Sequence, residues 1–399
     1  MTVDTDLPQL PFRRSGLLEI APEYARLRER APLVRVRTEA GDLAWLATRY
    51  HTVRQLFADE RLGRSHPDPS SAPRVSGSLL FGGPTGDFDT EPELNRLHRE
   101  VLAPAFSARR ARLVAGHVRA LATGMIDRLA QRQPPVDLHE HLSFPLPVIA
   151  ICELLGVPVA ERDLFRLWSA RFAGLVDPAD AAGAVMAMQH HMRELVGEKR
   201  SHPGDDLVSD LIAAAEGHPL LTDDEIADIA VHLLLGGHEN TVARIDHGTL
   251  LLLRHPEQRE ALRRHPALVE AAVEEILRVS VPVEDHFPRW ARADIEVGEV
   301  TIRAGEAVLL SPSVANMDES VYPEPERFDI FRTPAPPQTG SGQGFAPTVG
   351  AALARMELRA IFSLLFQRLP GLRTAVPLAE LRGEEERGTG GLKWLPVTW

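Results

Sequence analysis

The sequence contains very little cysteine, since among its 399 residues only Cys152 carries a thiol. One cysteine excludes an internal disulfide and any metal site built from several cysteines. Cys152 lies in the apolar run 148–155, so we expect a buried thiol. Long apolar runs are also missing, because no segment approaches the roughly eighteen residues that a membrane-spanning helix needs. The N-terminal residues lack the charged head and apolar stretch of a signal peptide, so we expect a cytoplasmic protein.

Positive charge is scarce as well. The chain has 44 Lys and Arg against 56 Asp and Glu, a formal net charge of -12. This balance disfavours binding to nucleic acid or to an anionic membrane. With 44% hydrophobic and 25% charged residues the chain can bury a large core. No linker-like stretch or internal repeat divides it, and we therefore expect a single domain over residues 1–399.

Helical periodicity dominates what is present. It predicts helices near residues 22–30, 92–103, 108–132, 140–155, 160–172, 178–199 and 205–216. Near-alternation of apolar residues predicts a hairpin of strands 34–37 and 43–47, and further strands near 294–302 and 306–310. Residues 63–90 are rich in Ser, Pro and Gly and predict a long loop. The expected fold class is mainly α with small β-sheets.

The longest predicted helix begins at Thr222 and runs to about Arg254. Thr222 and Glu225 form a T-x-x-E capping box, in which each side chain bonds a backbone N–H at the start of the helix. Gly236 and Gly237 lie in its middle, where each costs about 1 kcal/mol relative to alanine. We expect a neighbouring group to approach the backbone closely there.

Residues 342–357 read GQGFAPTVGAALARME. This run resembles the haem-binding loop of cytochrome P450 monooxygenases, G-x-G-x-H-x-C-x-G-x-x-L-A-R-x-E, with Thr348 at the cysteine position. Residues 236–240 are similar to the oxygen-activating helix of the family, with Asn240 at its threonine position. Glu275 and Arg278 match the E-x-x-R motif, and Arg327 matches the later P-x-R-F element. The resemblance implies a triangular, mostly helical prism, in which Glu275, Arg278 and Arg327 are structural.

The resemblance also indicates what the haem site has lost. In the family a cysteine thiolate is the axial iron ligand, whereas a threonine hydroxyl stays protonated near neutral pH. The residues that hold the haem propionates in the family correspond here to Leu94, His98, Ala346 and Arg289, and only Arg289 keeps its usual type. We therefore predict that haem binding is lost and that the protein has no cofactor.

Three functions remain open, and with them the question of whether the protein is an enzyme. The first is a non-catalytic pseudoenzyme similar to the cysteine-lacking cytochrome P450 homologues that activate a partner glycosyltransferase in bacterial natural-product biosynthesis. Another biosynthetic enzyme could equally be the partner. The second is a haem-free enzyme that uses the old pocket for acid/base or cyclisation chemistry on a natural-product intermediate. The third is an unusual haem protein without a thiolate ligand.

Candidate residues follow from the same resemblance. The catalytic candidates are Glu239, His238, His286 and Asp285. The pocket is expected to be lined by His232, Gly236, Gly237, Glu239, Asn240, Val283 and Phe287. Glu239 is the best placed, because a carboxylate in the middle of a helix beside two glycines should face a cavity, where desolvation would raise its pKa.

No metal site is expected. His238 and Glu239 begin an H-E-x-x-H zinc motif, but Val242 stands where the second histidine is needed. His139 and His141 flank Glu140 at the start of the predicted helix 140–155, where adjacent residues point about 100° apart and cannot easily share an ion. We interpret this histidine pair as part of a solvated helix face.

Overall fold

The computed structural model describes residues 7–77, 82–102, 108–173, 178–280, 286–333, 349–383 and 391–399. The chain forms two compact units. The sheet unit comprises Met1–Arg96, Glu284–Arg327 and Thr333–Phe345. The helical unit comprises Leu97–Val283, Phe328–Arg332 and Ala346–Trp399. Helix α3 (Glu91–Leu102) contributes residues to both units.

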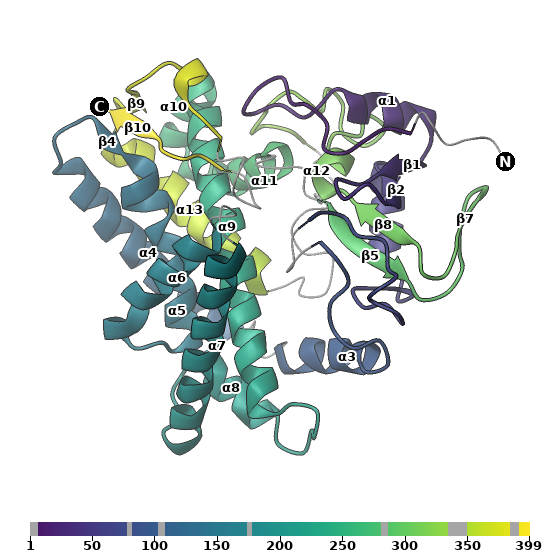
Figure 1. Cartoon of the computed structure of the whole chain (residues 1–399). Coiled ribbons are helices and arrows are strands. Elements are labelled where there is room, and N and C mark those ends of the chain that lie inside the picture. Colours follow the sequence, from purple (N-terminus) through teal and green to yellow (C-terminus); the bar gives the residue numbers. More distant parts are fainter. Residues whose placement is uncertain are drawn as a thin grey trace. The chain divides into compact units, whose positions relative to one another are not determined.

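The sheet unit is built on a five-stranded sheet of order β1-β2-β8-β5-β3 (Figure 1). Its strands are β1 (Leu33–Arg37), β2 (Leu43–Ala47), β3 (Leu62–Gly63), β5 (Phe287–Ala291) and β8 (Ala307–Leu310). Strands β2 and β8 are parallel, and the other neighbours are antiparallel. Its remaining elements are α1 (Glu23–Arg30), α2 (Tyr50–Phe57), α12 (Pro312–Ala315) and the hairpin β6 (Ile295–Val297) and β7 (Val300–Ile302).

Apolar residues cover both faces of this sheet. Successive side chains of a strand point to opposite faces. Leu309 accordingly joins one buried cluster with Val34 and Leu46, whereas Val308 and Leu310 join a second cluster. The sheet is therefore a core element of its unit, and its strands hold their side chains in fixed places.

The helical unit is an assembly of helices with one small sheet of order β4-β10-β9. Its long helices are α4 (Ala108–Ala130), α5 (Pro145–Leu155), α6 (Arg162–Ala173), α7 (Pro178–Ser201), α9 (Asp223–Arg254) and α13 (Val349–Arg368). The shorter helices are α8 (Leu207–Ala214), α10 (Pro256–Arg264) and α11 (Val269–Val279), with single turns at η3 (Val159–Glu161), η4 (Pro266–Leu268) and η5 (Leu378–Glu380). A π-helix, η2 (His139–Ser143), precedes α5. The strands are β4 (Val136–Asp137), β9 (Arg373–Thr374) and β10 (Pro396–Thr398).

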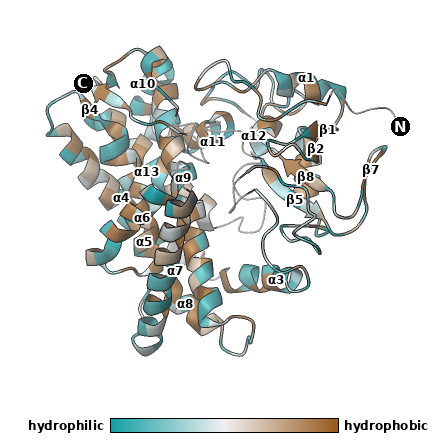
Figure 2. Ribbon diagram, in the orientation of Figure 1, coloured by the Kyte–Doolittle hydropathy of each residue, from teal (hydrophilic) through white to brown (hydrophobic). Residues whose placement is uncertain are grey.

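Helix α9 is the central element of the helical unit and packs against α5, α7 and α13. Figure 2 shows apolar and polar residues interspersed around the helices of this unit. Gly248 allows the closest approach, because a Cβ added there would lie 2.6 Å from a ring atom of Phe362 and 2.9 Å from Ile276. Three helices therefore meet at a glycine that has no room for a side chain.

The predicted fold class, mainly α with small sheets, is confirmed. The hairpin at residues 34–47 and the helix that starts after Thr222 form as expected. The predicted loop 63–90 begins one residue early, because Gly63 ends strand β3, and its described residues 64–77 and 82–90 contain no helix or strand. The capping box forms only in part: Thr222 Oγ1 accepts from Glu225 N at 3.2 Å, while the Glu225 carboxylate contacts His98 instead.

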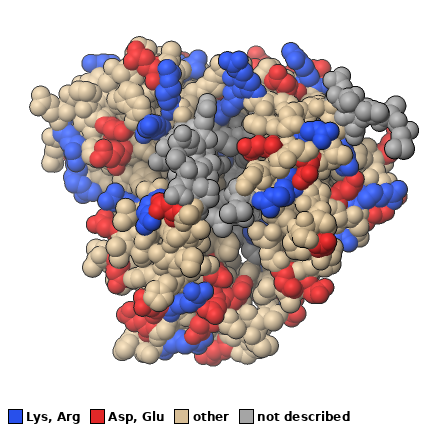
Figure 3. All heavy atoms as spheres, viewed as in Figure 1, with Lys and Arg blue, Asp and Glu red and all other residues tan. Residues whose placement is uncertain are grey.

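Among the described residues, no helix is both long enough and apolar enough to cross a membrane. On the face of the molecule in Figure 3, basic and acidic side chains are interspersed.

Candidate active site

One face of α9 is open in the helical unit. His232, Gly236 and Asn240 are four residues apart, so they lie one above the other on the helix, and all three are exposed. Among the described residues, none lies within 4 Å of a Cβ added to Gly236. The exposed face therefore contains three of the predicted pocket residues, and the described part of the chain leaves space over the glycine.

The start of α13 lies on the second glycine. A Cβ added to Gly350 would be 3.7 Å from the Cα of Gly237. This contact is the close approach that the mid-helix glycines predicted. Helix α13 begins at Val349, directly after Thr348. Thr348 and Ala346, two of the expected haem-site positions, lie outside the described residues.

His238 and Glu239 do not share the open face. His238 is 1% exposed, and its Nε2 lies 3.3 Å from the Phe144 carbonyl oxygen. The two rings also meet edge to face, with centroids 4.9 Å apart. This makes His238 a core histidine. Glu239 is also buried, with 6% of its surface exposed. Its expected position facing a cavity and its catalytic role stay predictions.

Asn240 stands where the family has a threonine, and the neighbouring Thr241 does not take over that role. Its hydroxyl donates to the Gly237 carbonyl at 2.9 Å and is buried. The open face of α9 thus offers the amide of Asn240 at the position of the family's threonine, and the imidazole of His232 two turns earlier, whose Nδ1 lies 2.7 Å from the Asp228 carbonyl oxygen.

Two arginines lie side by side at the edge of the sheet. Strand β3 pairs with β5 so that Gly63 is opposite Trp290, and Arg64, the residue after β3, lies close enough to Arg289 on β5 for their charges to interact. Burial, followed by the positive charge of Arg64, lowers the pKa of Arg289 to about 10, although Glu91 opposes the shift. Burial also lowers the pKa of Arg64. Two guanidinium groups that repel each other in a desolvated place favour an anion beside them.

Glu91 is already engaged by other donors. Its carboxylate accepts from Arg64 N at 2.7 Å and Ser65 N at 3.1 Å, and it forms an ion pair with Arg292 at 3.2 Å. Burial opposes ionisation of Glu91, but these hydrogen bonds and the nearby cation lower its pKa overall. Arg64 was not predicted from the sequence. The signal that could have found it is its cross-strand position, which depends on the sheet register.

The predicted site residues near β5 do not all have the same surroundings. His286 Nε2 lies 3.0 Å from Tyr24 Oη, and burial lowers the pKa of His286 to about 4. A neutral His286 bound to Tyr24 on α1 has a structural role within the sheet unit. Phe287 is 37% exposed and its ring meets Phe57 edge to face at 5.8 Å, so its place in a pocket stays a prediction. Asp285 and Val283 lie outside the described residues.

The other expected haem-site positions lie on α3. Leu94 is partly buried. His98 is buried, and its Nε2 lies 2.8 Å from Glu225 Oε1 at the start of α9. His98 therefore joins α3 to α9 within the helical unit.

Glu275 and Arg278 form the buried pair that the E-x-x-R motif predicts. Arg278 donates from Nε and Nη2 to the Glu275 carboxylate at 2.8 and 2.7 Å. Glu275 Oε1 also accepts from Asp329 N at 2.9 Å. The pair thus holds the chain just after the P-x-R-F element. Arg327 itself forms an exposed ion pair with Glu324 at 3.2 Å.

The comparisons with known proteins identify the family. The profile described as "Cytochrome P450" matches residues 179–370. Pentalenolactone synthase of Streptomyces exfoliatus is 43% identical, covering 99% of this chain and 100% of that protein. Mycinamicin IV hydroxylase/epoxidase of Micromonospora griseorubida is 38% identical, covering 98% of each. The crystal structure of a putative thioether synthase involved in griseoviridin tailoring is 32% identical, with a TM-score of 0.89, and covers 99% of this chain and 100% of that one. The chain belongs to the cytochrome P450 family.

These relatives overturn part of the sequence interpretation. Hydroxylase/epoxidase and N-oxygenase are names of oxidative enzymes, carried by relatives that align over nearly the whole chain. The prediction of a haem-free, non-catalytic pseudoenzyme that assists a glycosyltransferase is therefore wrong, and so is the haem-free enzyme. The prediction that no cofactor binds is wrong as well, because haem is the cofactor of this family. The prediction of lost haem binding rested on four altered positions of the haem site. The sequence does not reveal the second arginine, Arg64, because its place beside Arg289 depends on the sheet register.

The residues present fit the carboxylates of haem but not the thiolate ligand that the family provides for its iron. The Arg64–Arg289 pair offers two positive charges to the haem carboxylates. The family's cysteine ligand would have no counterpart here, because Thr348 stands at that position and Cys152 is fully buried in α5, where burial raises its pKa to about 12. Cys152 is therefore a protonated thiol in the core. With no other cysteine in the sequence, a thiolate ligand is excluded.

Proposed function

We propose that this chain is a haem-dependent oxidative enzyme that modifies an intermediate of a bacterial natural-product pathway, in the cytoplasm. The observation that carries the proposal is the end-to-end similarity to pentalenolactone synthase, at 43% identity. Haem supplies the activation of oxygen in this family. The fold is also similar to that of the solved putative thioether synthase, with a TM-score of 0.89 over 99% of this chain.

The described residues would contribute in two places. In the sheet unit, Arg64 and Arg289 would bind the haem carboxylates, and burial strengthens such charge-assisted hydrogen bonds. In the helical unit, the open face of α9 would offer space at Gly236 and an amide at Asn240. An amide orients a bound molecule by hydrogen bonds but does not relay protons at neutral pH.

The test begins with the purified protein, expressed with ample haem precursor. We expect one haem per chain by the pyridine haemochromogen assay. We also expect the reduced CO complex to absorb away from the thiolate position, because the sequence supplies a hydroxyl at residue 348. Pentalenolactone precursors and mycinamicin IV are then titrated while the Soret band is followed, and oxidised product is assayed with an electron-transfer system.

Thr348→Cys is the matched variant. It should move the CO band to the thiolate position and raise turnover, since a thiolate donates electron density that a hydroxyl does not. A colourless wild-type protein that also forms no product would overturn the proposal. An unchanged spectrum in Thr348→Cys would show that residue 348 is not at the axial position.

A further inference from the structure

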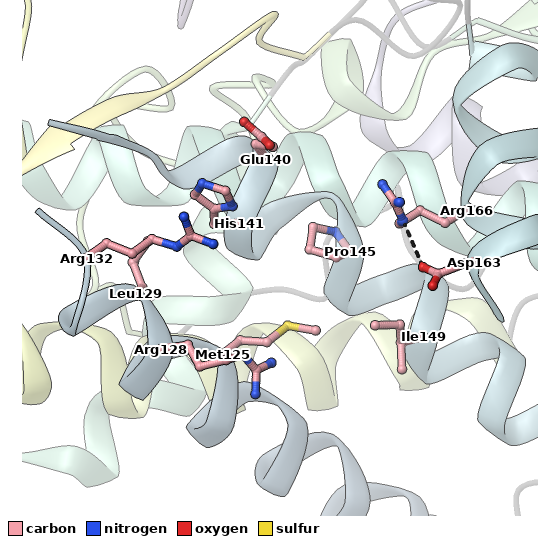
Figure 4. A pocket seen from close by; sticks show the side chains of 10 residues that line it. All are labelled: Met125, Arg128, Leu129, Arg132, Glu140, His141, Pro145, Ile149, Asp163 and Arg166. Carbon is pink, nitrogen blue, oxygen red and sulfur yellow. Dashed lines mark hydrogen bonds and ion pairs between the residues drawn. The ribbon is translucent and has the colours of Figure 1, made fainter. Parts of the chain in front are cut away.

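A pocket outside the candidate active site lies in the helical unit, between α4, η2 and the first turns of α5 and α6 (Figure 4). Its volume is about 360 Å³, which is within the range of small-molecule sites. None of the family features described above involves it. We propose that this pocket binds a small carboxylate with an apolar body.

Positive charge exceeds negative charge in the lining. Three arginines and two carboxylates line the pocket, which leaves an excess of one positive charge on a chain whose net charge is -12. Arg166 is compensated by Asp163 at 3.3 Å. Glu140 is exposed, and Figure 4 shows its carboxylate at the upper margin, apart from Arg128.

Arg128 and Arg132 carry the uncompensated charge. Arg128 lies in the last turn of α4, and Arg132 follows two residues after the helix ends at Ala130, where its N–H donates to the Leu129 carbonyl at 3.0 Å. Both side chains line the pocket. Within the described residues, neither side chain forms an ion pair. Two positive charges on the lining of one pocket repel each other, and a bound anion would offset that repulsion. A planar guanidinium matches a carboxylate through two parallel hydrogen bonds.

The floor of the pocket is apolar. Met125 and Leu129 come from α4, and Pro145 and Ile149 come from α5. Met125 and Leu129 are 5% and 1% exposed, so the floor is fixed in the core. An ion such as phosphate would leave this surface wet, whereas the chain of an amphipathic carboxylate would cover it.

The wall that carries His141 is held rigidly. Phe144 N donates to the His139 carbonyl at 2.9 Å, which closes the wide turn of the π-helix. His139 Nδ1 lies 2.7 Å from Asp246 Oδ2, and Asp246 is fully buried in α9. The sequence interpretation of His139 as solvated is therefore wrong. His141 is held next to this anchor and lines the pocket as a further polar group.

Octanoate is the probe, measured by isothermal titration calorimetry with the full chain. Octanol is the neutral probe with the same chain length, and inorganic phosphate is the anion without an apolar body. We expect saturable octanoate binding, with octanol and phosphate each weaker by about tenfold or more, because a charge-assisted pair and an apolar contact each contribute about that factor.

Arg128→Gln and Arg132→Gln, singly and together, locate the site. Each single variant should weaken octanoate binding by about tenfold, and the double variant should abolish it. Arg119→Gln is the matched control, since Arg119 is exposed on the same helix outside the pocket. Thermal melts identify any variant that fails to fold, and the single variants then decide the question. Unchanged octanoate affinity in the double variant, no binding by the wild type, or phosphate as tight as octanoate would each overturn the proposal.

Discussion

Glu357 is a carboxyl group in the interior of α13 with 0% exposure. Within the described part of the chain, neither of its oxygens has a hydrogen-bond partner. Burial raises its pKa well above the usual value of 4.5. The folded protein therefore holds a proton on Glu357 at pH values where the unfolded chain has released it.

Glu357→Gln tests this directly. Between the unfolded and the folded pKa the native state binds more protons, so the stability that this group contributes falls as pH rises. The glutamine variant has no such titration and should be more stable than the wild type at pH 8, by a few degrees in Tm, with the difference shrinking towards pH 5. Thermal unfolding at several pH values measures this. A pH-independent difference between the two proteins would contradict the interpretation.

The contribution of His286 to stability changes with pH in the opposite direction to that of Glu357. Its folded pKa is about 4 against an ordinary value of 6.5, so between these values the unfolded chain binds the additional proton. Stability should consequently fall as pH drops through this window. We expect His286→Gln to flatten that fall while losing the contact with Tyr24, which costs about 1 kcal/mol at pH 7.5. Urea unfolding at pH 7.5, 6 and 5 gives both quantities, and parallel pH profiles would disprove the assignment.

At the scale of elements, Gly248 shows how the packing of α9 depends on one missing side chain. Gly248→Ala would place a methyl group 2.6 Å from Phe362, and overpacking of this kind typically costs about 1–3 kcal/mol. Denaturant unfolding measures the loss. Gly197→Ala is the control, because Gly197 lies in α7 with nothing within 4 Å of its added Cβ. That substitution should stabilise by up to about 1 kcal/mol through helix propensity, and equal effects at both sites would rule out the packing argument.

The elements also differ in how well the sequence predicts them. Helix α9 was predicted to within a residue at each end, because Thr222 caps it locally and the apolar pattern repeats over many turns. The predicted helix 140–155 instead divides into η2 and α5. The cause is tertiary: the His139 side chain is drawn onto Asp246 of α9, a residue 107 positions away.

For the whole molecule, the test is whether it retains haem. Arg64→Gln removes one of the two cations beside β5, so we expect haem to transfer to apomyoglobin about tenfold faster than from the wild type. Arg61→Gln is the control, because Arg61 is exposed and paired with Asp59 at 2.6 Å. Equal transfer rates for the two variants would show that Arg64 does not hold the haem carboxylates.

The sequence by itself determined the family and its fold class, because both are indicated by short sequence motifs and local patterns. Caps, periodicity, and the spacing of Glu275 to Arg278 act over a few residues and need no knowledge of distant contacts. The same holds for the lack of a thiolate, since the only cysteine lies in an apolar run that had to be buried.

Only the tertiary structure decided which residues meet. It placed His238 against Phe144 in the core of the helical unit, and His286 against Tyr24 within the sheet unit. It also brought Arg64, the residue after β3, near Arg289 on β5, more than two hundred residues away in the sequence. Strand register and helix packing are set by the sum of many apolar contacts along the chain, and no short stretch of sequence contains that sum.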